Sequence, residues 1–225
     1  MKRLKKALTK IIPEYSFIPL ALALSFNFLV YYGARLVAGN WHHYNITTPL
    51  DRRIPFWSPS AFIYLGCYLF WCINYILIAR QSKKEVCQFF SADLLSRLIC
   101  LVCFLAFPTT TVRPYVEPDG FWNQVILLLY SIDAADNLFP SIHCLVSWFC
   151  YIGIKRKKEI PVWYQRISCI IAILVCISTL TTKQHVLIDV IGGILLAEIS
   201  FRIGKHTSIA QTYERFLDKI QRFIP

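Results

Sequence analysis

The sequence predicts an all-α, polytopic membrane protein with six transmembrane helices, and three observations lead to this fold class. Of the 225 residues, 56% are apolar and only 16% are charged, whereas a soluble domain carries about 25% charged residues. The apolar residues form long runs, several of them close to the ~20 residues that a helix needs to cross a bilayer. The basic residues form short clusters between these runs. This composition excludes a soluble globular enzyme, a disordered chain and a secreted disulfide scaffold.

Six apolar runs are the expected membrane spans. The first is too long for the core of a signal peptide, and no small-residue cleavage site closes it, so we expect it to be retained. Several of the later runs are shorter than ~20 residues, which predicts tilted helices or polar ends buried against neighbouring helices. In chain order the six runs are residues 15–37, 60–79, 91–107, 140–154, 167–180 and 186–203.

A further apolar stretch, residues 121–132, is too short to span a bilayer. We expect it to form a short interfacial helix in the loop before the fourth span. Neither a repeat nor a linker divides the chain, so residues 1–225 are expected to form a single integral membrane domain. The nine cysteines lie mainly in apolar runs, where a free cysteine behaves as a small hydrophobe. Neither a disulfide nor a metal site is therefore expected.

The basic residues set the expected orientation in the membrane. Six spans place both termini on one side, and the segments on that side hold 18 of the 24 lysine and arginine residues. The positive-inside rule then places both termini in the cytoplasm and the loops 38–59, 108–140 and 181–185 outside. The same distribution explains the formal charge of +11 without nucleic acid as a partner. We expect an integral membrane protein, in the plasma membrane, whose surroundings are the lipid bilayer.

Polar residues gather where the outward loops meet the expected spans, in segments 109–114, 137–143 and 181–189. Because all three segments lie at the same membrane surface in this topology, we expect them to converge. His185 and Asp189 are four residues apart and therefore lie on one face of a helix. A carboxylate in that position orients the imidazole and stabilises its charged form.

These residue types have the chemistry of phosphoryl transfer. Ser141 and His143 follow a proline at a helix start, where free backbone N–H groups and the helix dipole favour an anion. Arg113 and Lys183 add two positive charges that hold phosphate oxygens. One histidine attacks phosphorus while the other protonates the leaving oxygen. This chemistry requires neither a metal ion nor another cofactor.

The chain resembles the type 2 phosphatidic-acid phosphatase superfamily, which includes lipid phosphatases, undecaprenyl-diphosphate phosphatases and, with related motifs, sphingolipid phosphotransferases. The family motifs are a Lys with Arg-Pro seven residues later, a Pro-Ser-Gly-His, and a Ser-Arg followed by His-x-x-x-Asp. Arg113-Pro114 matches the end of the first motif, residues 140–143 match the second with Ile for Gly, and residues 185–189 match the end of the third. The order, the spacing and the six-span layout agree over roughly residues 60–203.

Two family residues are replaced in this chain. Ala106 stands where the first motif has its lysine, and Thr179 stands where the third has its arginine. Lys183 is the expected substitute for that arginine, as in the branch near the inositol-phosphoceramide-type synthases, which the chain most resembles. The resemblance implies that His185 is the nucleophile, Asp189 its carboxylate partner and His143 the general acid. It also implies that three residues bind phosphate, namely Arg113, Lys183 and Ser141.

We therefore expect a membrane enzyme that cleaves a phosphoester or diphosphate of a lipid at the outer face, through a phosphohistidine that water hydrolyses. Without these two cations, a dianionic phosphomonoester should bind more weakly. A phosphodiester or a diphosphate is therefore kept as an alternative substrate. A phosphotransferase, in which a lipid or polyol hydroxyl replaces water, is the alternative reaction. A non-catalytic lipid-binding scaffold is the alternative of another class, and the two replaced residues are its best support.

Two pairs of opposite charges lie inside expected spans. Asp93 and Arg97 are four residues apart in the third span, and Glu198 and Arg202 repeat this spacing in the sixth. Charge inside a membrane is a functional signal by default, but opposite charges at this spacing meet on one helical face. We expect both pairs to be structural ion pairs, and we expect Gly192-Gly193 to allow close helix packing.

Overall fold

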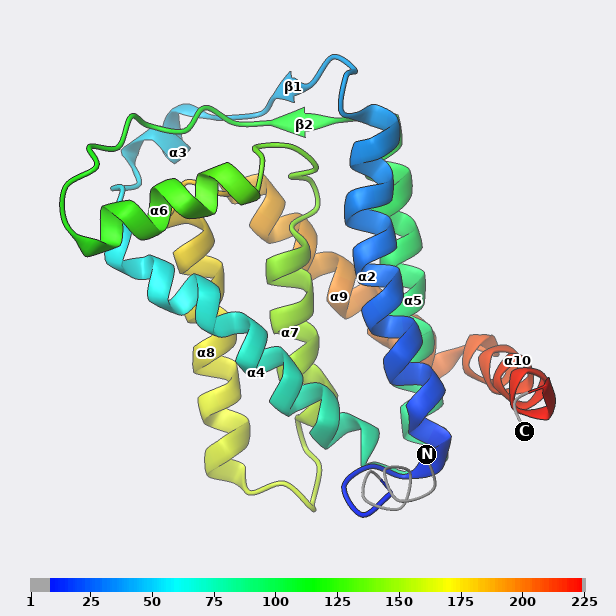
Figure 1. The fold of residues 1–225 in the computed structure, drawn as a ribbon. Coiled ribbons are helices and arrows are strands. Elements are labelled where there is room, and N and C mark those ends of the chain that lie inside the picture. The colour runs from blue at the N-terminus through cyan, green and yellow to red at the C-terminus, as the bar shows by residue number, and fades with distance from the viewer. Residues whose placement is uncertain (1–8, 224–225) are drawn as a thin grey trace.

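The structure of the protein is a computed structural model that describes residues 9–223, so most of the basic N-terminal head lies outside the described residues. The chain forms a bundle of helices, which confirms the predicted all-α class (Figure 1). The long helices are α2 (Phe17–Ala38), α4 (Ala61–Ala79), α5 (Lys83–Ala106), α7 (Ile142–Ile154), α8 (Val162–Thr181) and α9 (Leu187–His206). The shorter elements are η1 (Glu14–Ser16), β1 (Tyr44–Asn45), α3 (Pro49–Arg53), η2 (Ser58–Ser60), β2 (Thr109–Thr110), α6 (Phe121–Ile132) and α10 (Ile209–Phe223).

Each expected span overlaps one long helix, and several of these helices are suited to cross a membrane. Within the described residues, four helical segments are long and apolar enough for this, and they contain α2, α4, α5 and α8. Helix α7 has 13 residues, which at ~1.5 Å per residue gives about 20 Å, less than the ~30 Å of a hydrocarbon core. The count of six spans therefore stays a prediction.

Helix α5 begins at Lys83, well before the expected start of the third span at residue 91. The Ser82 hydroxyl accepts a hydrogen bond from the backbone N–H of Glu85, and the Glu85 carboxylate accepts one from the backbone N–H of Ser82. This capping box satisfies two backbone donors at the helix start. Hydropathy marked only the apolar part of this helix, whereas the capping residues fix its beginning.

Two central helices organise the bundle. Helix α5 packs against α2, α9 and α10, and α7 packs against α4, α8 and α9. Phe89 of α5 and Phe149 of α7 are almost fully buried, and their ring centroids lie 5.5 Å apart in an edge-to-face contact. These aromatic contacts hold the two halves of the bundle together, whereas a cavity lies between α2 and α4.

The two charge pairs that the sequence pointed to have different outcomes. Asp93 and Arg97 form the expected ion pair, with Oδ1 and Nη2 3.1 Å apart. Glu198 instead accepts a hydrogen bond of 2.9 Å from the indole N–H of Trp148, and the described residues show no ion pair between Glu198 and Arg202, so that expectation is wrong. Arg202 is exposed near the end of α9, where a long side chain extends toward water.

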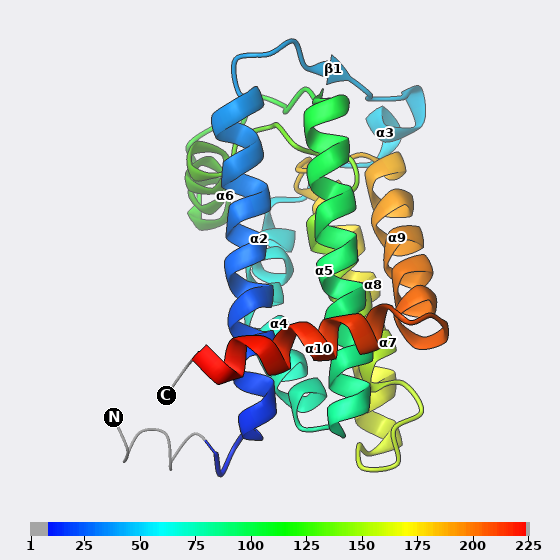
Figure 2. The same cartoon turned by 90° about the vertical axis from the view of Figure 1, so that its right-hand side faces the viewer.

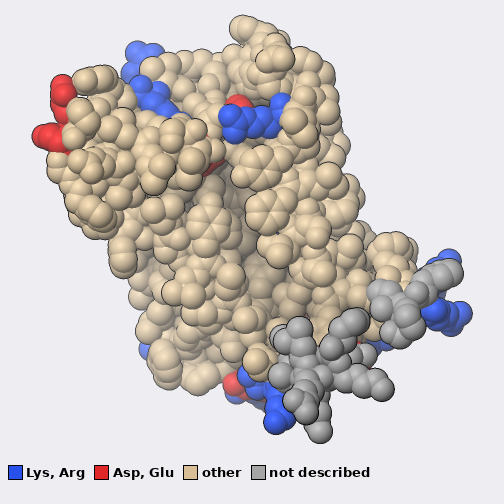
Figure 3. All heavy atoms as spheres, viewed as in Figure 1, with Lys and Arg blue, Asp and Glu red and all other residues tan. Residues whose placement is uncertain are grey.

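The loops expected on opposite sides of the membrane lie at opposite ends of the bundle. Helices α3 and α6 and strands β1 and β2 gather at one end, and α6 lies crosswise there at the expected residues (Figure 1). Helix α10 lies across α5 at the other end (Figure 2), where Tyr213 and Leu217 are buried and Lys83 pairs with Glu214 and Asp218. Between the two ends, the face seen in Figure 3 is nearly free of charged side chains, as a lipid-facing surface requires.

The separation of the two ends gives a test of orientation. Asp119 is exposed near α6, and Lys158 is exposed at the opposite end. On intact cells, Asp119→Cys should react with an impermeant maleimide, whereas Lys158→Cys should react only after permeabilisation, because the positive-inside rule places that loop in the cytoplasm. The parent chain, with its nine native cysteines, gives the background labelling. The reverse pattern would place the α6 end in the cytoplasm.

Candidate active site

A cavity of about 520 Å³ opens between α2 and α4 and extends toward α6, α7 and the turn between α8 and α9. It is visible as a hollow in the face shown in Figure 3. The wall at the opening consists largely of aliphatic and aromatic side chains of α2 and α4. The end near α6 is polar and is lined by Tyr31, Asp133, Asn137, His143, Gln184 and His185. Two segments far apart in the sequence therefore bring both expected histidines into one cavity.

His185 is held by the carboxylate four residues later. It precedes α9, and its Nδ1 lies 3.2 Å from Oδ2 of Asp189. The same carboxylate oxygen accepts a hydrogen bond of 3.0 Å from the backbone N–H of Val186, and Asp189 is fully buried. Because Asp189 occupies Nδ1, the lone pair of the neutral imidazole is on Nε2.

The electrostatics of His185 follow from these contacts. Burial lowers the pKa of His185, but the hydrogen bond and the negative charge of Asp189 outweigh this effect, so the pKa is raised above its ordinary value. The protonated form is therefore stabilised.

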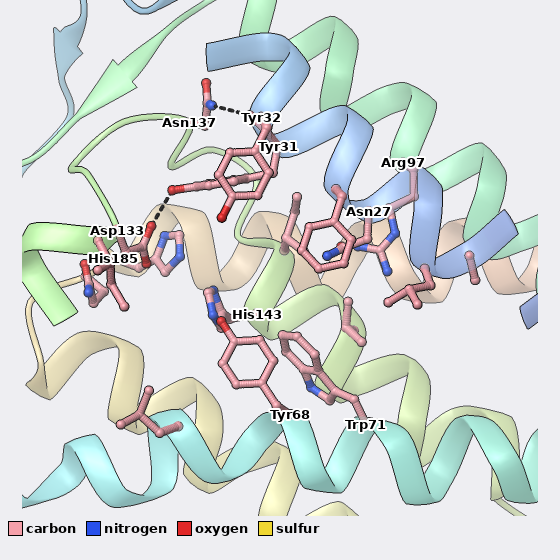
Figure 4. Close-up of a pocket in the computed structure, with 18 of the residues that line it drawn as sticks. Asn27, Tyr31, Tyr32, Tyr68, Trp71, Arg97, Asp133, Asn137, His143 and His185 are labelled. Atoms are coloured by element: carbon pink, nitrogen blue, oxygen red, sulfur yellow. Dashed lines mark hydrogen bonds between the residues drawn. The ribbon is translucent and has the colours of Figure 1, made fainter. Parts of the chain in front are cut away.

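His143 lies at the start of α7, with its ring centroid 5.9 Å from that of His185. Its Nδ1 is 3.5 Å from the hydroxyl of Tyr64, which donates a hydrogen bond of 3.0 Å to Asp133. Its Nε2 has no hydrogen-bond partner among residues 9–223. Tyr31 of α2 also donates to Asp133 (Figure 4). The two tyrosines thus bind both carboxylate oxygens of Asp133 beside the histidines.

The two histidines are close because α9 touches the beginning of α7. The backbone N–H of Ser141 donates to the carbonyl of Asp189 at 3.1 Å. A Cβ at Gly193 would lie 2.6 Å from the carbonyl oxygen of Ser141, and one at Gly192 would lie 2.5 Å from the ring of Phe139. Only glycine permits this approach, so the close packing expected from the two glycines is present.

Ser141 itself is fully buried and caps α7, where its hydroxyl accepts a hydrogen bond from the backbone N–H of Cys144 at 3.3 Å. It is not among the residues that line the cavity. Its expected role as a phosphate binder stays a prediction, and its observed role is to begin the helix that carries His143.

Lys183 lies in the turn before His185 but is directed to α3 rather than to the histidines. Its amine donates hydrogen bonds to the carbonyls of Asp51 and Ile54 at 2.9 and 2.5 Å. The Asp51 carboxylate in turn accepts a hydrogen bond of 2.7 Å from the backbone N–H of Leu187 in the first turn of α9. In this structure Lys183 therefore joins α3 to the turn of His185, and the expected substitution for the family arginine stays a prediction.

Arg113 lies behind the cavity rather than in it. One guanidinium nitrogen donates to the carbonyl of Tyr130 at 3.2 Å, and another donates to the side-chain oxygen of Gln184. The guanidinium also lies 4.3 Å from the ring centroid of Tyr130, in a cation–π contact. Gln184 does line the cavity, and its buried Nε2 has no partner among the described residues. Arg113 thus orients an amide whose N–H groups are free beside His185.

Sequence reasoning missed four residues of this site, namely Tyr31, Tyr64, Asp133 and Gln184. Gln184 stands beside His185 in the sequence, so its position was a signal in itself. The other three belong to α2, α4 and the end of α6 and follow no recurrent spacing. The described residues contain no group of three His, Cys, Asp or Glu side chains arranged to hold a metal ion, and metal independence stays a prediction about the reaction.

The family model of the PAP2 superfamily matches residues 35–203, which is most of the chain and contains both histidines. The chain belongs to the PAP2 superfamily. This confirms the resemblance to the type 2 phosphatidic-acid phosphatases that the motifs indicated. Comparisons with curated proteins and with solved structures gave no significant match.

Membership of the PAP2 superfamily settles the broad class of activity. Its members are phosphatases or phosphotransferases, so the chain is an integral membrane enzyme of the type that acts on lipid phosphoesters. The helices that suit a membrane agree with this assignment. In this PAP2 protein, the matched segment brings His143, His185 and Asp189 together from α7 and α9.

The glycine contact between α7 and α9 gives a prediction on turnover. Gly193→Ala forces its new Cβ against the Ser141 carbonyl and separates the two histidines, so turnover of a lipid phosphate should fall on the order of 10²-fold, as small misplacements of reacting groups do. Gly66→Ala is the matched control, because a Cβ there meets nothing within 4 Å. That control should keep its turnover and gain up to ~1 kcal/mol of stability from better helix propensity. Equal turnover in both variants would contradict the need for this contact.

The Asp189 contact gives a prediction on pH dependence. A nucleophilic His185 is active when neutral, so kcat/KM should rise with pH through a pKa above the usual ~6.5 of histidine. Asp189→Asn removes the negative charge that raises this pKa, and the acidic limb of the profile should move to lower pH. The profile is measured between pH 4.5 and pH 9, conditions chosen to span the expected pKa by roughly two units on each side. An unshifted limb in a folded variant would mean that another group titrates.

Proposed function

We propose that this PAP2 protein is a phosphatase that hydrolyses a phosphoester or diphosphate bond of a lipid through a phosphohistidine. The observation that carries the proposal is the pair of imidazoles, His143 and His185, with centroids 5.9 Å apart in one cavity. Each has its Nδ1 beside a fixed oxygen, which leaves Nε2 as the ring nitrogen available to a phosphoryl group in the space between the rings. A phosphoryl group in that space contacts both rings.

In the first step, Nε2 of His185 attacks phosphorus, and the bond between phosphorus and the lipid oxygen breaks. His143 donates its Nε2 proton to the departing oxygen, which leaves as an alcohol or, from a diphosphate, as a lipid monophosphate. Asp189 stabilises the positive charge that develops on His185 as the phosphorus–nitrogen bond forms.

In the second step, His143 takes a proton from water, and the resulting nucleophile breaks the phosphorus–nitrogen bond. Inorganic phosphate leaves, and His185 is restored to its neutral form. Tyr64 links His143 to the carboxylate of Asp133. These hydrogen bonds orient the imidazole.

Phosphate oxygens need donors, and Gln184 supplies them in this proposal. Its side-chain oxygen is held by the positively charged Arg113, which polarises the free N–H groups at Nε2. The start of α7 adds the positive end of a helix dipole next to His143. In this proposal Arg113 acts on phosphate through Gln184, and Ser141 acts through the start of α7, which it caps. Lys183 acts by holding the turn that precedes His185.

A lipid substrate fits the shape of the cavity. The opening between α2 and α4 is lined by apolar side chains such as Leu24, Phe28 and Leu65, all of which are exposed on the membrane-facing surface. Alkyl chains placed there stay in contact with the bilayer while the phosphate reaches the histidines. We therefore propose access from the side, in the leaflet at the α6 end, which the predicted topology makes the outer leaflet.

A phosphotransferase is the second candidate, and the burial of the site favours it. Only 9% of the surface of His185 is exposed. A transferase must exclude water from its phosphorylated intermediate until an alcohol binds. The two reactions share the phosphohistidine and differ only in the nucleophile of the second step.

Labelled substrate separates these candidates. A lipid monophosphate or diphosphate carrying ³²P is incubated alone with the detergent-solubilised protein, and inorganic phosphate is measured with and without EDTA. We expect phosphate release in both conditions, and we expect quenched samples to carry acid-labile, base-stable label that His185→Ala abolishes. Both results follow from a metal-free phosphorus–nitrogen intermediate.

Three other outcomes would replace the proposal. Label that moves only when a lipid or polyol alcohol is added identifies a transferase. Activity that EDTA abolishes and Mg²⁺ restores indicates metal-assisted transfer. If neither label transfer nor phosphate release occurs, and His185→Ala binds the lipid as the parent does, the protein is a lipid-binding scaffold.

A further inference from the structure

The cavity has a second polar end, whose residues belong to none of the family motifs. Arg97 of α5 and Asn27 of α2 both line it. Figure 4 shows them on the side of the cavity away from His143 and His185. Between the two polar ends the wall is aromatic and includes Trp71.

Arg97 has hydrogen-bonding capacity beyond its ion pair. Its Nη2 binds Asp93, which also accepts a hydrogen bond of 2.8 Å from Tyr75. Its Nε and Nη1 are buried and have no partner among residues 9–223. Only 2% of the arginine surface is exposed. Free guanidinium donors in an apolar interior are costly unless an acceptor meets them.

Within residues 9–223, Asn27 lacks a hydrogen-bond donor, whereas Arg97 lacks further acceptors. Its side-chain oxygen is buried, and it too has no partner among the described residues. The same end of the cavity thus offers unsatisfied donors from α5 and an unsatisfied acceptor from α2. A single group that both accepts and donates a hydrogen bond satisfies both sides, and a hydroxyl or a secondary amide is such a group.

The charge of this end favours a neutral group over a second phosphate. Asp93 and Arg97 pair within 3.1 Å, so their charges cancel locally. Oδ2 of Asp93 is buried and unpartnered in the described part of the chain, and it would repel an added anion. A neutral group gains hydrogen bonds here without adding charge inside the bilayer.

We propose that Arg97 and Asn27 form a subsite for a neutral hydroxyl or secondary amide of the lipid, close to its phosphate. The position of the phosphate rests on the proposed function, whereas the subsite rests on the unpartnered atoms. The substrate class is thereby narrowed to lipid phosphates that carry a hydrogen-bonding group which both donates and accepts near the phosphate linkage.

One lipid can reach both polar ends of the cavity. Tyr31 of α2 binds Asp133 at the histidine end, and Asn27 precedes it by four residues on the same helix. Their backbones are about 6 Å apart along the helix axis. Because both ends line one cavity, a lipid with its phosphate between the histidines places its carbon chain beside Asn27 and Arg97.

Three kinds of non-hydrolysable alkylphosphonate of equal chain length test the subsite by binding alone. The first carries a hydroxyl, which is moved along the chain one carbon at a time in a series. The second carries a methyl ether at the same carbon as each hydroxyl, and the third is plain. Dissociation constants are measured by isothermal titration calorimetry on the full-length protein in detergent. The hydroxyl compound should bind about tenfold or more tightly than the plain one, as added hydrogen bonds to buried unpaired groups predict. The ether, which only accepts, should fall between them.

Two variants remove the subsite in different ways. Asn27→Leu removes the acceptor, and the double variant Asp93→Asn with Arg97→Met removes the ion pair without leaving a buried charge. Both should reduce the preference for the hydroxyl compound over the plain one severalfold. Asn74→Leu is the matched control, because Asn74 is a buried asparagine of α4 that does not line the cavity. It should keep the full preference.

Equal affinities of the hydroxyl and plain compounds for the parent protein, at every position of the hydroxyl in the series, would overturn the proposal. A preference that survives in both subsite variants would do the same, because the group would then be bound elsewhere. Equal affinities of the hydroxyl and ether compounds would exclude the acceptor role of Asn27. Absence of phosphate release from labelled lipids would refute the proposed phosphatase activity and leave these binding results unaffected.

Discussion

The contact between the first turn of α9 and the start of α7 is the constraint on which the site depends. The backbone hydrogen bond from Ser141 to Asp189 joins the two motifs directly, and Gly192 and Gly193 remove the side chains that would separate them. Because the helices approach at their polar ends, the two histidines meet while the rest of each helix stays in an apolar environment. A small outward shift of α9 would move His185 away from His143 without unfolding either helix.

The loops around this contact are held by partly buried polar interactions instead of by regular secondary structure. Lys183 has a φ of 56°, a left-handed backbone that is unfavourable for a side-chain-bearing residue, and its amine binds α3. Asp51 caps α9 from outside that helix. Arg113 holds Gln184 from the opposite side. Arg113 and Lys183, the cations that the sequence patterns assign to phosphate, therefore hold the loops of the site in this structure. The polar groups that line the histidine end of the cavity are imidazoles, carboxamides, carboxylates and a tyrosine hydroxyl.

The cavity combines two demands that conflict in a membrane. Its walls must be apolar to accept a lipid, yet it contains polar groups at both ends. At the histidine end, Asp133 is satisfied by two tyrosine hydroxyls. At the other end, Arg97 is satisfied only in part, by Asp93. Among the described residues, each end therefore holds some polar groups by hydrogen bonds and leaves others without a partner: Nε2 of His143 and of Gln184 at the first end, and Nε and Nη1 of Arg97 at the second.

The sequence by itself determined the helical class, the approximate position of each long helix, the short helix at residues 121–132 and the superfamily. Hydropathy and motif order are local properties, so they can be read along the chain. It also identified His143 by the Pro-Ser-x-His pattern, and His185 with Asp189 by their four-residue spacing, although His185 lies just before α9 and not in it. The sequence could not place Lys183 or Arg113, because a charged residue in a loop can turn toward several partners. Nor could it find Asp133, Tyr64 or the free atoms of Arg97, since these depend on which helices pack together. Only the tertiary structure decided those contacts, because burial forces each polar group to take the nearest partner in space and not in sequence.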